Sequence, residues 1–251
     1  MRRPVLVFAA LAAAVALFAL RLAPAAIADT RIAAMTNGNV HLADVEGTLW
    51  NAKGIIAAGA TRMPVAWRID AAPLLRGELH LRLVRDEGGS ASMPKGDIAI
   101  GRNSVELRDI DVTIPAALVA AAAGSRTGLA GGDVAVNAAL VDWAPPGTRG
   151  DARVRWLGAW IAVPGSTEPI ALGDITAALS GNADRLSGPI SNSGGDLAIQ
   201  GALTCGAQSG VQLSLVLTPR RADDRNLAQA LSMIGAPEGD GWRVEWRIPL
   251  R

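Results

Sequence analysis

A short unit of glycine, an acidic residue and then alternating apolar residues recurs along this chain and constrains its fold more than any other feature. Six copies occur, at Gly77-Glu78-Leu79, Gly96-Asp97-Ile98, Gly132-Asp133-Val134, Gly150-Asp151-Ala152, Gly173-Asp174-Ile175 and Gly195-Asp196-Leu197. Glycine permits the positive φ that tight turns need, and alternation after it is typical of a half-buried strand. The copies are spaced by 19, 36, 18, 23 and 22 residues, about one β-hairpin or two. The sequence therefore predicts consecutive hairpins.

Alternation of apolar and polar residues locates several strands. The pattern is clearest over residues 65–69, 77–84, 211–217 and 242–250. Between residues 105 and 114 the apolar positions change phase at Arg108-Asp109, which predicts a β-bulge or a bend. Two helices are expected. One runs from Ala116 to Ala123 between Pro115 and Gly124, and the other begins near Asp223-Asp224 and ends at Gly235. We therefore expect a mainly β fold, an extended, twisted or curved antiparallel sheet with two short helices.

The N-terminal segment carries the signals of an exported protein. Arg2-Arg3 precede an uncharged, almost wholly apolar run that begins at Val5 and ends at Leu20. As a helix, sixteen residues span about 24 Å, slightly less than the roughly 30 Å of a hydrocarbon core. The positive charge before the run predicts a cytoplasmic N-terminus. A cleaved signal is the alternative, because Ala26-Ile27-Ala28 fits a small-x-small cleavage site.

Both interpretations divide the chain at the same place. Residues 1–28 are expected to form the cytoplasmic tip and the single transmembrane helix, or a signal. Residues 29–251 are then expected to form a periplasmic β-rich domain.

Charge and the reactive side chains exclude several function classes. Residues 29–251 carry 21 basic and 23 acidic side chains, a balance that argues against nucleic acid as a partner. One cysteine, Cys205, allows no intrachain disulfide, and two lone histidines, His41 and His80, do not make a zinc site. We find no catalytic motif, and we predict no enzyme activity, no metal and no cofactor.

The seven tryptophans stand out in a chain that has no tyrosine. Trp156 and Trp160 are expected to share a strand face across Gly158, and Trp242 and Trp246 repeat that spacing. Core packing is the simpler explanation for such side chains. An apolar groove lined by these four tryptophans is the alternative.

Several segments together resemble a known family. They include the run Val45, Glu46, Gly47, Thr48, Leu49 and Trp50, then residues 74–79, 172–174, 194–197 and 240–242. In this order and spacing they are similar to type II secretion system protein N. By its residues alone, the run from Val45 to Trp50 reads as a structural turn that inserts an apolar side chain into the core.

This resemblance implies an accessory subunit of the type II secretion machinery in the bacterial inner membrane. Such a protein would have one membrane span and a periplasmic β domain that contacts other secretion subunits, and it would serve export of folded proteins across the outer membrane. The family supplies no catalytic residues. A membrane-anchored periplasmic module that binds lipid or another apolar ligand is the alternative function.

Overall fold

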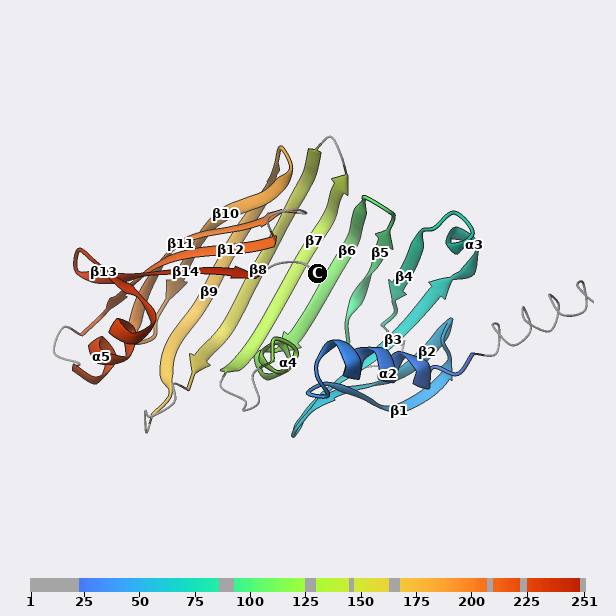
Figure 1. Ribbon diagram of the computed structural model, residues 1–251, viewed down its shortest axis with the longest axis horizontal. Coiled ribbons are helices and arrows are strands. Elements are labelled where there is room, and N and C mark those ends of the chain that lie inside the picture. Colours follow the sequence, from blue (N-terminus) through green and yellow to red (C-terminus); the bar gives the residue numbers. More distant parts are fainter. Residues whose placement is uncertain are drawn as a thin grey trace, which may run out of the picture.

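The computed structural model describes residues 23–85, 93–124, 130–144, 147–162, 168–206, 210–221 and 225–248. Within these residues fourteen strands form one antiparallel sheet (Figure 1). Neighbouring strands follow one another in chain order from β1 to β12, and β14 then lies between β12 and β13. The expectation of a mainly β chain of consecutive hairpins is therefore confirmed.

The strands range from three to fifteen residues. They are β1 (His41–Thr48), β2 (Asn51–Ala58), β3 (Thr61–Asp70), β4 (Leu79–Leu83), β5 (Lys95–Ile100), β6 (Val105–Pro115), β7 (Ala130–Ala144), β8 (Gly147–Ile161), β9 (Ile170–Asn182), β10 (Arg185–Ser193), β11 (Leu197–Gly206), β12 (Gly210–Pro219), β13 (Ala236–Glu238) and β14 (Gly241–Ile248).

The described residues hold more helices than the two we expect from the sequence. Both expected helices are present, as α4 (Ala116–Ala122) and α5 (Arg225–Ile234). The structure adds α2 (Ala26–Met35) and the single turn α3 (Ala71–Leu74). Helix α2 escapes prediction because no side chain caps its start and its apolar residues follow no helical stripe. It also crosses the expected boundary at residue 28.

The recurring glycine units lie mostly inside strands, which corrects our expectation that they mark turns. Only the copies at residues 77 and 195 precede a strand. The other four lie within β5, β7, β8 and β9, and each has a glycine with positive φ. The pairing register shifts at or beside the glycine of each of these four units, Gly96, Gly132, Gly150 and Gly173. Because a β-bulge bends its strand and increases its twist, these units curve the sheet.

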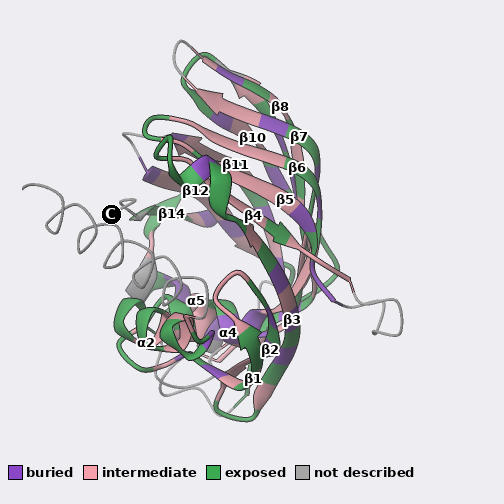
Figure 2. Ribbon diagram, turned by 90° about the vertical axis from the view of Figure 1, so that its right-hand side faces the viewer, coloured by how far each residue is buried: buried purple, intermediate pink, exposed green. Residues whose placement is uncertain are grey.

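The curved sheet has one concave face, on which helices α2, α4 and α5 lie (Figure 2). The larger core cluster joins inward side chains of β6–β12 and β14 with Leu227 and Leu231 of α5. A smaller cluster joins Leu42, Val65 and Trp67 of β1 and β3 with Ala25 and Ile32 at α2. The helices therefore close parts of the apolar concave face, while the convex face carries the polar side chains of the strands.

No helix within the described part of the chain is both long enough and apolar enough to span a membrane. The segment from Val5 to Leu20, in which we expect the transmembrane helix, lies outside the described residues.

Candidate docking surfaces

The run from Val45 to Trp50 builds the first hairpin and fastens it to its neighbours. Val45 packs against the smaller core cluster. The indole N–H of Trp67 donates to the carbonyl of Leu49 (3.0 Å), and the amide of Ile69 donates to the carbonyl of Trp50 (2.7 Å). The amide of Leu49 donates in turn to the carbonyl of Ala23 (2.9 Å). The run thus links the chain before α2 to strand β3.

Gly47 and Asp44 give this hairpin its shape. Gly47 has φ +108°, and a Cβ at this position would collide with the carbonyl oxygen of Asn51. Asp44 has φ +50°, and the β1–β2 register shifts between Ala43 and Glu46. The carboxylate of Glu46 reaches Lys53 at 3.0 Å on the surface. These contacts show that the run from Val45 to Trp50 shapes and stabilises the first hairpin.

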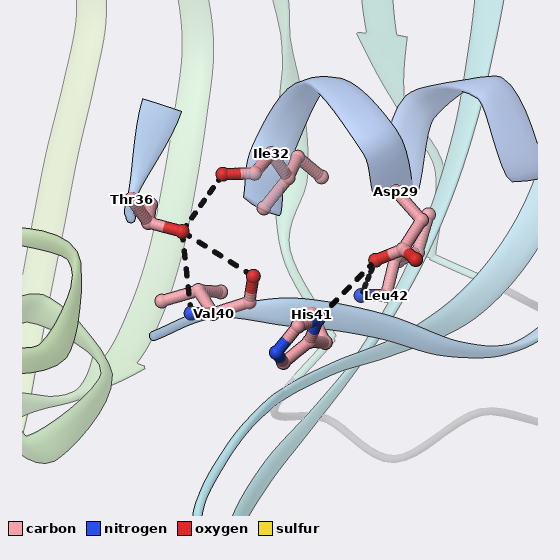
Figure 3. Close-up of polar contacts among 6 residues, drawn as sticks. All are labelled: Asp29, Ile32, Thr36, Val40, His41 and Leu42. Carbon is pink, nitrogen blue, oxygen red and sulfur yellow. Dashed lines mark hydrogen bonds and ion pairs between the residues drawn. The ribbon is translucent and has the colours of Figure 1, made fainter. Parts of the chain in front are cut away.

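Helix α2 covers the outer edge of β1 (Figure 3). The carboxylate of Asp29 accepts the amide of Leu42 at 2.7 Å, and the hydroxyl of Thr36 accepts the amide of Val40 at 3.2 Å. The Thr36 hydroxyl also donates to the carbonyl of Ile32 (2.7 Å). The backbone groups of an unpaired edge strand can pair with a strand of another chain. Here side-chain oxygens already bind two of these backbone amides, so the amides are not available for such pairing.

The convex face of β3–β6 carries a charged hollow of about 320 Å³. Its polar lining consists of Asp70, His80, Arg82, Asp97, Glu106 and Arg108. Arg82 donates to Asp97 at 2.6 Å, and Arg108 pairs with Glu106. The hydrogen bond to Asp97, together with its charge, raises the pKa of Arg82 above its ordinary value. Since its cations and anions alternate across strands, the hollow suits a partner that carries charges of both signs.

Neither histidine gathers a catalytic set within the described residues. Nδ1 of His41 lies 3.9 Å from Asp29, and Nε2 of His80 lies 3.6 Å from Glu78. No serine or threonine hydroxyl in the described ranges hydrogen-bonds to either imidazole. The same ranges contain no cluster of three or more His, Cys, Asp or Glu placed to hold a metal ion.

The structure does not bring the four tryptophans together on one face. The register of β8 shifts between Trp156 and Ala159, and Ala159 is buried in the core. Trp160 follows Ala159 and therefore points to the opposite face, where it is 37 % exposed. The expectation that Trp156 and Trp160 share a face is wrong, because the bulge inverts the alternation.

The other tryptophans of that set occupy different environments. Trp156 packs against the larger core and donates its indole N–H to the carbonyl of Gly131 at 2.8 Å. Trp242 also packs against this core, whereas Trp246 on the same face of β14 is 61 % exposed. Two of the four thus serve packing, and the exposed two lie on opposite faces of the sheet.

Most of the chain matches a known protein family. A family model described as type II secretion system (T2SS), protein N matches residues 38–245, from just before β1 into β14. The chain belongs to the type II secretion system protein N family. No curated protein and no solved structure gave a match. Members of the protein N family are components of type II secretion, so the chain is a protein-transport component of that system.

Proposed function

We propose that this chain is an accessory inner-membrane subunit of the type II secretion machinery. The observation that carries the proposal is the family match, which spans the sheet from its first strand into β14. In this proposal the segment before Ala23 holds a cytoplasmic tip and an uncleaved anchor whose apolar run extends from Val5 to Leu20. Residues 29–251 form the periplasmic domain, together with the short stretch from Ala23 to Ala28 that packs on the first hairpin.

The mechanism that we propose is tethering. One membrane span confines the sheet to the membrane surface, which raises its effective concentration near other membrane-bound subunits. The convex face of β3–β6 is our candidate surface for those subunits, since it offers charged pairs at half-exposed positions around the hollow. Charged pairs at the rim of an interface contribute mainly to partner choice and association rate.

Deletion of the gene followed by measurement of extracellular and periplasmic proteins tests the function. We expect secreted proteins to accumulate in the periplasm and the full-length chain to restore their export. Unchanged export in the deletion strain would contradict the proposal. Reporter fusions after residue 28 and at the C-terminus test the topology, and N-terminal sequencing of the mature chain tests cleavage after Ala28.

The charged hollow can be tested separately with a matched pair of variants. Arg82→Asp alone places a second carboxylate beside that of Asp97. The double variant, Arg82→Asp with Asp97→Arg, restores an ion pair with the two charges exchanged. Both side chains are about half exposed, so we expect the swapped pair to leave the fold intact. A docking role then predicts that both variants lower export. A purely structural role predicts that the double variant restores it.

A second candidate function, binding of an apolar ligand, is favoured by the concave face of the central strands. Leu81, Ile98 and Leu107 point to this face from β4, β5 and β6 in register, and they are only half-buried. Ile100 beside them is 41 % exposed. Fluorescence of a naphthylamine probe tests this candidate. We expect binding that Ile100→Glu abolishes and that Leu75→Glu, at a 92 % exposed position, leaves intact.

A further inference from the structure

The two edges of the sheet differ in how far the backbone groups of their edge strands are covered. At the β1 edge, side chains in α2 or directly after it accept the backbone amides of Val40 and Leu42. Thr48 forms a β-bridge with Pro24. At the other end, β13 covers β14 only over Gly241, Trp242 and Arg243 (Figure 1). Residues 244–248 of β14 pair with β12 on one side and have no strand on the other among the described residues.

The pairing registers show which backbone groups face outward on this edge. The hairpin β13–β14 closes on Glu238 and Gly241, so Gly241 directs its N–H and C=O toward β13. Alternate residues of a strand point the same way, so Glu245 and Arg247 direct theirs to the open side. Neither backbone has a hydrogen-bond partner on that side among the described residues. The open edge therefore offers two donors and two acceptors.

We propose that the occupant of this edge is β14 of a second copy of the chain, paired antiparallel about a two-fold axis at Trp246. In this register Glu245 faces Arg247 of the second copy, and Arg247 faces its Glu245. Both are positions whose backbone groups face outward, so the two pairs exchange four hydrogen bonds. The contact is isologous and closes as a dimer.

The charge pattern of β14 selects this register over its neighbours. Shifting the axis to Glu245 would place that carboxylate against its own copy and Arg243 against Arg247. Shifting it to Arg247 would place the two Arg247 side chains together. Like charges directly opposite destabilise a strand pair, while opposite charges stabilise it. An axis at Val244 would also pair Arg243 with Glu245 of the second copy, but β13 already occupies the outer side of Arg243. Among the registers that β13 leaves open, only the axis at Trp246 gives two complementary pairs.

The concave side of β14 supports the same register. Trp246 is 61 % exposed, although it follows the inward stripe of Trp242 and the buried Val244. At the two-fold axis it meets Trp246 of the second copy in a non-hydrogen-bonded position, where cross-strand side chains approach most closely. The dimer thus covers the largest exposed aromatic side chain on the inward face of β14.

Two single charge reversals and their mixture test the proposal on the full-length chain in detergent. Glu245→Arg and Arg247→Glu each place like charges opposite one another in a homodimer, so we expect self-association to weaken about tenfold or more relative to the natural chain. Mixing the two variants restores both complementary pairs, and we expect a heterodimer by light scattering and by pull-down of a tagged variant. A natural chain that stays monomeric, or a mixture that does not associate, would overturn the proposal.

Disulfide trapping tests the axis itself. In a Cys205→Ser background, Trp246→Cys places two thiols at a pair whose Cα atoms lie about 4.5 Å apart, within the range of a disulfide. We expect rapid formation of a covalent dimer on mild oxidation. Leu75→Cys, at a 92 % exposed position, is the matched control for random collision. Equal rates of dimer formation for the two variants would contradict the proposed axis. A Trp246→Cys chain that forms a disulfide with a different protein, and none with its own copy, would also contradict it.

Discussion

Gly131 and Trp160 form a cross-strand pair in which a missing side chain makes room for an aromatic ring. They are partners in the β7–β8 ladder, and a Cβ on Gly131 would collide with the indole of Trp160. The indole of Trp160 therefore lies over the bare backbone of Gly131. The bulge in β8 turns Trp160 outward and thereby selects the glycine that it covers.

The prediction for this pair concerns stability. We expect Gly131→Ala to lower the free energy of unfolding by about 1–3 kcal/mol, because the indole must leave its position. In a Trp160→Ala background the same change should cost nothing, since alanine loses less backbone entropy on folding than glycine. Urea unfolding of the four chains of this double-mutant cycle measures the coupling. Equal costs in both backgrounds would show that the two residues do not interact.

The thiol of Cys205 provides a prediction about pH. Cys205 packs against the larger core, and burial raises the pKa of its thiol above the ordinary value. We expect iodoacetamide to modify the folded chain more slowly than the urea-unfolded chain at pH 8, with the rates converging at higher pH. The unfolded state releases the proton first, so this group lowers stability as pH rises above the ordinary thiol pKa. A folded thiol that reacts as fast as the unfolded one contradicts this.

Among the elements, helix α2 and strand β1 depend on each other through side-chain caps. None of the residues of the helix is buried, yet Asp29 accepts the amide of Leu42 in β1, and Thr36, just past the helix, accepts the amide of Val40, just before the strand. The helix therefore stabilises the sheet edge mainly by hydrogen bonding, together with the packing of Ile32 against the smaller core.

We expect Asp29→Ala to destabilise this edge by about 0.5–1.5 kcal/mol, the net contribution of one hydrogen bond. Hydrogen exchange of the Leu42 amide should accelerate about threefold to tenfold, by the same estimate. Asp29→Asn retains the acceptor oxygen and should leave the exchange rate near that of the natural chain. Glu46→Gln, which removes an exposed ion pair, should change little. Equal exchange rates for the alanine and asparagine variants would show that the cap does not protect β1.

At the scale of the whole molecule, one continuous sheet carries two separate cores. The smaller core lies under α2 on β1–β3, the larger extends from β6 to α5, and β4 and β5 between them carry mainly half-buried side chains. Such an arrangement favours local unfolding of one end while the other stays folded.

Two core substitutions test this division. Leu42→Ala in the smaller core and Leu197→Ala in the larger one should each cost about 2–5 kcal/mol locally. Leu42→Ala should accelerate hydrogen exchange in β1–β3 and leave β9–β12 protected, and Leu197→Ala should do the reverse. Uniform loss of protection in either variant would instead indicate a single cooperative unit.

The alternation within strands, the order of neighbouring strands and one bulge could be predicted from the sequence. The phase change at Arg108-Asp109 is a bulge with Asp109 at φ +49°, as predicted. The glycine units were recognised as sites of positive φ, but turns and bulges both require that conformation. The distinction depends on whether a neighbouring strand continues past the glycine, which is a non-local property.

The sequence by itself determined that this chain is a meander of antiparallel strands, because side-chain alternation is local and short connections pair successive strands. Only the tertiary structure decided the curvature and the division of the tryptophans between the two faces. It also decided that the edge at β1 is capped by side chains while the edge at β14 stays open. These features depend on cross-strand register, in which a slip of one residue exchanges the faces of a whole strand.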